Sequence, residues 1–236
     1  NGMTWLQALN QATLLAMPDD TVLPQMQWYH DAVAFCLKNG IMSNSNGGYF
    51  GVNDTVTRAD TALAIWTLAG KPGKGSTEMT FTDVSPDDPA APAIAFLSGL
   101  GVMQGYSEEV FAPQDTLTRE QLSMVFRRFV NVQNLYLGAI SLDDLSAYSD
   151  RAKVSAEARD AMSWMVGSGL LSGNVKNRLA PRETLTRAQL AVILQRYDCL
   201  KTTAAEELKQ SQAAEVPLTD TPAPELTAEE AVIVTP

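Results

Sequence analysis

The chain has 236 residues, of which 45% are apolar and 19% charged, a composition typical of globular domains. Its net charge of −10 makes duplex DNA and anionic membranes unfavourable partners, because both require clustered Lys and Arg. No apolar run is long enough to cross a bilayer, and the sequence holds no metal-ligand cluster, cofactor motif or catalytic pair. We therefore expect no membrane insertion, nucleic-acid binding, metal, cofactor or enzyme activity.

The first segment, residues 1–19, is expected to be a lead-in that contains one short amphipathic helix over residues 3–17. Pro18 is expected to end that helix. The chain begins with Asn1 and not with Met, which indicates a processed or trimmed form.

An internal repeat occupies most of the remaining chain. A Thr-Arg pair occurs at Arg58, Arg119 and Arg187, and the residues around each arginine match without gaps. A glycine lies 18 residues before each arginine, an apolar residue eight before it and an acid four before it. These residues are Gly40, Gly101 and Gly169, then Phe50, Phe111 and Leu179, then Asp54, Asp115 and Glu183. Agreement at fixed offsets predicts three copies of one structural unit.

Each copy predicts a helix, a loop and a second helix. Apolar residues at i, i+3 and i+4, such as Ala32, Phe35 and Cys36, predict one buried stripe on the first helix, which the glycine then ends. The threonine before each arginine begins the second helix, with capping-box spacing to an acid or amide. One such unit is too small to bury its apolar face alone. We therefore expect a mainly α fold in which the three units share one core with pseudo-threefold character.

The predicted boundaries divide the chain into five segments: the lead-in, three repeats over residues 20–72, 80–132 and 147–200, and a tail over residues 201–236. The tail is acidic. It begins with a helix-prone stretch and continues into Pro217, Pro222 and Pro224, so we interpret it as a linker or a disordered end.

The arginine at the first helical position of each second helix requires an explanation, because a cation is mildly unfavourable at a helix N-terminus. Either it pairs with an acid such as Asp54, Asp115 or Glu183, or it joins the helix end in holding an external anion. The residues alone leave both roles open.

Other reactive residues have plain interpretations. The single histidine, His30, is expected at the surface, Cys36 and Trp164 in the core, and a Cys36–Cys199 disulfide is not expected. The acid pairs are expected in solvated turns; they are Asp19-Asp20, Asp87-Asp88 and Asp143-Asp144. Trp28, at the entry to a helix, is the best aromatic candidate for a ligand groove.

These motifs resemble the S-layer homology family over residues 20–200. The carrying motifs are Phe81-Thr82-Asp83-Val84, Tyr148-Ser149-Asp150, Thr57-Arg58-Ala59-Asp60, Thr118-Arg119-Glu120-Gln121 and Thr186-Arg187-Ala188-Gln189. The resemblance implies a three-bladed, mostly helical prism. It also implies that grooves between its repeats bind secondary cell-wall polysaccharide, often ending in a pyruvate ketal whose carboxylate meets the signature arginine.

Seven residues are therefore expected to bind ligand: Arg58, Arg119, Arg187, Trp28, Gly105, Tyr106 and Gly173. The two glycines are expected to let a ligand approach the backbone, although a plain turn explains them equally well. Only Asp60 keeps an acid at the fourth signature position, so Arg58, whose repeat also has Trp28, is the first choice among the arginines.

The implied function is non-covalent anchoring of a bacterial surface protein at the extracellular face of the cell wall. The expected partner is the wall polysaccharide, with other surface-layer proteins as further partners. The alternative is a scaffold for protein interaction or spacing whose sugar sites have decayed.

Overall fold

A computed structural model describes residues 28–214 apart from 46–47, 74–80, 135–136, 138–139, 141, 144 and 175. The expected lead-in helix over residues 3–17, the pair Asp19-Asp20 and the tail beyond residue 214 lie outside the described residues.

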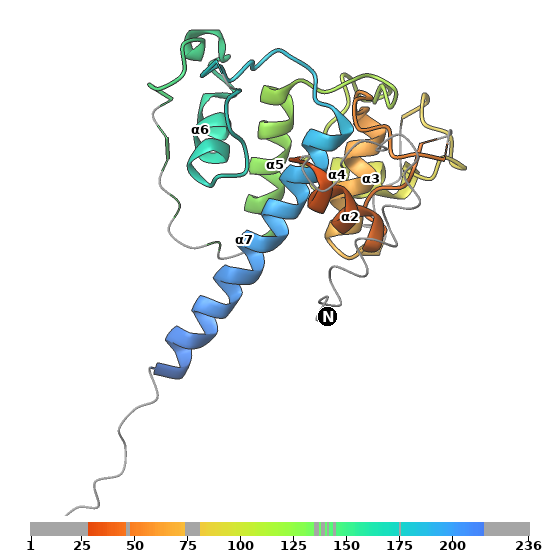
Figure 1. Ribbon diagram of the computed structural model, residues 1–236. Helices are drawn as coiled ribbons and strands as arrows, with labels where there is room; N and C mark the ends of the chain where they lie inside the picture. Colours follow the sequence, from red (N-terminus) through yellow and green to blue (C-terminus); the bar gives the residue numbers. More distant parts are fainter. Residues whose placement is uncertain are drawn as a thin grey trace, which may run out of the picture.

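The described chain is helical and contains no named strand (Figure 1). Its α-helices are α2 (His30–Lys38), α3 (Arg58–Leu68), α4 (Ala91–Gly99), α5 (Arg119–Gln133), α6 (Arg159–Gly167) and α7 (Arg187–Ala214), and a short 3-10 helix, η2, spans Arg151–Lys153. The first helices of the three repeats begin and end at equivalent positions. The predicted mainly α fold and the helix–loop–helix repeat are confirmed.

The ends of these helices form as their sequences predict. Thr57 and Thr118 are N-caps with complete capping boxes, and Thr186 makes the same pair of hydrogen bonds with Gln189. The three helix-ending glycines adopt φ of +62°, +68° and +72° in the left-handed region. These are Gly40, Gly101 and Gly169. Local chemistry thus sets both helix boundaries in every repeat.

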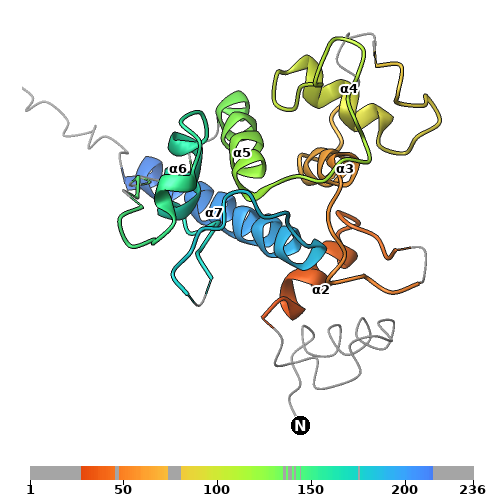
Figure 2. The same cartoon turned by 90° about the horizontal axis from the view of Figure 1, so that it is seen from above.

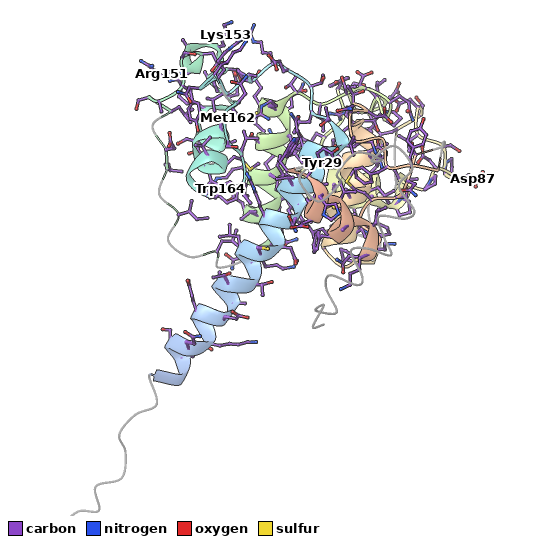
Figure 3. All side chains as sticks on the ribbon, in the orientation of Figure 1. Tyr29, Asp87, Arg151, Lys153, Met162 and Trp164 are labelled. Carbon is purple, nitrogen blue, oxygen red and sulfur yellow. The ribbon has the colours of Figure 1, made fainter. Side chains whose placement is uncertain are left out.

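Packing between the helices is cyclic and crosses the repeat boundaries. The first helix of each repeat packs against the second helix of the repeat before it: α4 on α3, α6 on α5, and α2 on α7 (Figure 2). Met162 of α6, which is labelled in Figure 3, accepts a hydrogen bond on its sulfur from Ser123 of α5 at 3.0 Å. Each repeat therefore supplies half of two helix pairs, and the last repeat closes onto the first.

Short extended segments before the second helices form a similar ring. Isolated antiparallel bridges join Thr57 to Thr116 and Thr118 to Thr184, and the third bridge joins Thr186 back to Thr55. The N-termini of α3, α5 and α7 are thereby brought together, because each begins directly after its bridge.

The shared core includes the predicted apolar stripes. Phe50, Phe111 and Leu179 are fully buried, and Trp164 and Cys36 are buried as predicted. The expectation that His30 lies at the surface is wrong: its side chain is 9% exposed, and its Nδ1 lies 2.9 Å from Asp31 Oδ1. His30 is the first residue of α2 and is buried together with Ala32, Val33 and Cys36. The apolar periodicity of the sequence did not assign this polar residue to the buried face of the helix.

Helix α7 continues past residue 200 to Ala214, so the helix-prone stretch at the start of the predicted tail is part of this helix. Its last turns project from the helical body (Figure 1). Ala204 is still buried, whereas Leu208 is 41% exposed, so the packed part of the helix gives way to a projecting part between these residues.

The two cysteines are free, as expected, and differ in environment: Cys36 is buried and Cys199 is exposed. Burial raises the pKa of the Cys36 thiol to about 12, although Arg187 partly opposes the shift. Because the thiolate is the reactive form, we expect a thiol-specific reagent to label Cys199 in the native protein and Cys36 only after denaturation. Peptide mapping of the labelled protein is the measurement, and rapid native labelling of Cys36 would contradict this packing.

Candidate functional site

The signature arginines are buried at the first position of α3, α5 and α7. Arg58, Arg119 and Arg187 have exposed fractions of 5%, 9% and 9%. The prediction that each lies in the first turn of a helix is confirmed.

Each guanidinium reaches across a repeat boundary and binds two backbone carbonyls. Arg58 Nε donates to Phe111 O at 2.8 Å and its Nη2 donates to Gln104 O at 2.7 Å. Arg119 makes the equivalent bonds to Leu179 O and Ser172 O, both at 2.7 Å. Arg187 closes the ring by binding Phe50 O at 2.7 Å and Ser43 O. Every arginine therefore holds the loop of the next repeat in the cycle.

Neither sequence-based explanation of these arginines describes the contacts fully. Within the described residues, none of the three makes an ion pair with a carboxylate. Burial lowers the pKa of Arg58, and Tyr106, Asp115 and Asp83 oppose that shift. The Asp115 carboxylate thus acts on the guanidinium of the neighbouring repeat through its charge and without an ion pair, while the Asp115 backbone carbonyl accepts the N–H of Arg58 at 2.8 Å.

The helix N-termini are also occupied. The backbone N–H groups of Arg119 and Glu120 donate to Glu183 O and Pro181 O, both at 2.9 Å, and the next N–H, of Gln121, donates to the Thr118 hydroxyl. Equivalent bonds satisfy the start of α3, where Ala59 N donates to Pro113 O at 2.9 Å. An external anion would therefore meet the arginine side chain and not the free N–H groups of a helix end.

Acids of the opening motifs fix the loops that the arginines hold. The Asp150 carboxylate, which is 5% exposed, accepts from the N–H groups of Leu179 at 2.7 Å and Ala180 at 2.9 Å. Asp83 does the same for Phe111 and Ala112. Ala112 and Ala180 have φ of +58° and +51°, so these carboxylates stabilise a backbone turn that alanine adopts at a cost.

A cavity of about 530 Å³ lies beside Arg119 and is built from all three repeats. The second repeat contributes Arg119, the third contributes the loop around Gly173 and the first turns of α7, and the first contributes Trp28. The charged side chains of its lining are Arg119, Arg178, Arg196 and Glu183. This volume falls in the range of small-molecule sites.

The sequence favoured Arg58 as the ligand-binding arginine because its repeat also contains Trp28 and Asp60, but the structure does not bring these residues together in one site. Trp28, which is 63% exposed, lines the cavity of Arg119 and not a site at Arg58. Arg58 instead lies 4.8 Å from the ring centre of Tyr106, itself 58% exposed. Asp60, the other reason for favouring Arg58, accepts the N–H of Thr57 within its capping box.

The two candidate glycines have a packing role. A side chain at Gly105 would lie 2.6 Å from the ring of Phe81, and one at Gly173 would lie 2.4 Å from the ring of Tyr148. The aromatic residue of each opening motif therefore requires glycine at this position, which accounts for the residue type without a ligand. Gly173 also lines the Arg119 cavity.

Sequence reasoning missed Arg178 and Arg196 as site residues. Arg196 lies nine residues after Arg187, and Arg128 occupies the same offset after Arg119, so the repeat alignment contained a signal. In the described part of the chain, no helix is long and apolar enough for a membrane span, and no cluster of three or more His, Cys, Asp or Glu suits a metal ion.

The chain belongs to the S-layer homology domain family. Three segments, residues 23–62, 80–123 and 147–191, match this family, and together they cover more than half of the chain. The family is a binding and anchoring module, and it supports association with the cell wall or cell surface.

Relatives of known name match the same region. The chain is 28% identical over 172 residues to an amylopullulanase of Thermoanaerobacterium thermosulfurigenes, covering 71% of this chain and 9% of that protein. It is 27% identical to a surface-layer 125 kDa protein of Lysinibacillus sphaericus, covering 70% and 14%, and 24% identical to a cellulosome-anchoring protein of Acetivibrio thermocellus, covering 64% and 33%. The chain thus spans a third or less of the length of these relatives.

Proposed function

We propose that this chain anchors a bacterial surface protein non-covalently to the cell wall by binding secondary cell-wall polysaccharide in a groove between its repeats. The observation that carries the proposal is the cavity at Arg119, where three arginines gather in a protein of net charge −10. A cationic cavity on an acidic molecule is suited to an anionic ligand.

The chemistry of the arginine favours a carboxylate on the sugar, as in a pyruvate ketal. Arg119 Nε and Nη2 already hold carbonyls of the third repeat, and Nη1 makes no hydrogen bond with the residues that the structure describes. A guanidinium fixed in this way keeps donors for an anion and loses little conformational freedom when it binds.

Names of two relatives agree with this proposal. One is a surface-layer protein and another a cellulosome-anchoring protein, whereas the enzyme among those described above shares only a small part of its length with this chain. We propose an extracellular location at the wall, no catalytic role for the repeats, and a linker role for the tail over residues 201–236.

A structural scaffold is the second candidate, and one observation favours it. Each signature arginine makes two hydrogen bonds that hold the fold together, so these residues are explained in part without any ligand.

Sedimentation with purified bacterial walls tests the proposal. We expect the protein to pellet with native walls, to bind far less after mild acid hydrolysis of ketal groups, and not to bind walls stripped of their secondary polymer. Binding should weaken as salt rises, because charge attraction is screened. Equal sedimentation with native and stripped walls, or none with native walls, would reject the polysaccharide anchor.

A further inference from the structure

We propose that the three inter-repeat grooves are not equivalent: the groove at Arg119 is the binding site, and Arg178 and Arg196 read the negative charge of an acidic saccharide unit held there. This inference rests on the proposed function and adds the site and residues that select the ligand. The Arg119 groove is defined by the lining of the 530 Å³ cavity.

Charge distinguishes this groove. Its lining contains three arginines and one glutamate, so positive charge exceeds negative charge by two. Arg119 is buried against the loop of the third repeat, whereas Arg178 and Arg196 remain open to solvent. An anion placed in the cavity therefore meets one fixed guanidinium and two accessible ones.

The two accessible arginines are oriented by neighbouring groups. Arg178 Nε lies 3.7 Å from Asp150 Oδ2, the carboxylate that fixes Leu179 and Ala180. Arg196 Nη1 donates to Gly169 O at 3.2 Å, at the end of α6. Each contact occupies only part of the guanidinium and restricts its side chain before a ligand binds. Less conformational entropy is therefore lost on binding.

The residues around Arg58 that are equivalent to the lining of the Arg119 groove can be identified from their offsets within the repeats. There Val110 replaces Arg178, Asp115 replaces Glu183 and Glu157 replaces Trp28, while Arg128 corresponds to Arg196. The equivalence is structural as well, because Arg58 and Arg119 bind carbonyls at the same offsets. Two arginines and two acids leave this groove without an excess of positive charge.

Positions around Arg187 are still less favourable for an anion. Tyr49 and Thr67 occupy the positions of Arg178 and Arg196, while Asp54 replaces Glu183 and Asp60 replaces Gln189. Arg187 is then the single cation among these positions, against two acids. Of the three grooves, the one at Arg119 alone combines a positive excess with an aromatic side chain at the Trp28 position.

Trp28 supplies the second feature of a saccharide site. Its side chain is 63% exposed at the cavity and contacts Tyr29 edge to face, with ring centres 5.4 Å apart. A large aromatic face held beside cationic donors suits a sugar ring that carries an acid group.

The repeat provides a matched test. Arg196→Gln removes a charge from the Arg119 groove, and Arg128→Gln removes an exposed arginine from the same helical position in the Arg58 groove. Each variant, together with Arg178→Gln and Trp28→Ala, is titrated calorimetrically with short oligosaccharides released from the wall polymer. Thermal unfolding confirms that each variant is folded.

We expect one site per chain. Arg196→Gln and Arg178→Gln should each weaken binding by about tenfold, which corresponds to loss of one charge-assisted interaction. Trp28→Ala should weaken binding as well, and Arg128→Gln should leave it unchanged. Two or three equal sites, or equal losses in Arg196→Gln and Arg128→Gln, would overturn the inference while leaving the anchoring function intact. Absence of binding by the unaltered protein would instead reject the proposed function.

Discussion

Replacing Arg187 with alanine is expected to lower the free energy of unfolding by about 3–5 kcal/mol. The change removes two charge-assisted hydrogen bonds to Phe50 O and Ser43 O, both on the loop of the first repeat. It also removes the cation that lies 4.8 Å from the Phe50 ring centre. For a protein of this size, the loss corresponds to a fall of roughly 10 °C in Tm.

Arg182→Ala is the matched control, because Arg182 is an exposed arginine five residues before Arg187, in the loop that precedes α7. We expect it to change stability by less than about 0.5 kcal/mol. Arg187→Lys should recover only part of the loss, since an ammonium group cannot reproduce the planar fork that reaches both carbonyls. Chemical denaturation of the three variants gives the comparison, and equal stability of Arg187→Ala and Arg182→Ala would show that the ring does not depend on this contact.

Asp150→Ala is expected to destabilise the protein by about 2–4 kcal/mol at neutral pH, because it leaves the N–H groups of Leu179 and Ala180 without their acceptor. Burial alone raises the pKa of Asp150, but the bonds from Ala180 and Leu179 and the charge of Arg178 lower it by more. The folded-state pKa therefore lies below its ordinary value.

A lowered pKa sets the direction of the pH effect. The stabilisation by Asp150 is fully present above the unfolded-state pKa, near 3.9, and is lost as pH falls through the lower folded-state pKa. The difference in stability between the unaltered protein and Asp150→Asn should thus be largest near neutral pH and shrink below about pH 4. Asp83→Asn provides the comparison, since Asp83 makes equivalent bonds but is exposed, and we expect a smaller effect. A difference that is constant from neutral to strongly acidic pH would contradict this role.

Helix boundaries were predictable because they are set by neighbours in the sequence. Thr57 and Asp60 cap the same helix, and Gly40 ends a helix whose apolar stripe precedes it directly. Such local signals determine where a helix begins and ends, independently of how the repeats pack against one another.

Grouping of the site residues was not predictable in the same way. Trp28 and Arg58 belong to one repeat, yet the cyclic exchange of helix partners places Trp28 beside Arg119. The acceptors of the arginines were also hidden, because Phe111 O and Gln104 O are backbone atoms that every residue carries. An acidic side chain can be recognised in a sequence, whereas a backbone carbonyl acceptor cannot.

Helix α7 gives the molecule a defined response to mechanical tension. The Thr186 bridge directly precedes its first turn, which carries the Arg187 contacts; later turns pack on α2, and the last turns project from the body. A force applied along this helix at its projecting end acts on the bridge, the arginine contacts and the α2 interface simultaneously, as a shear force. Rupture then requires these contacts to fail together, whereas peeling the helix sideways would break them one after another.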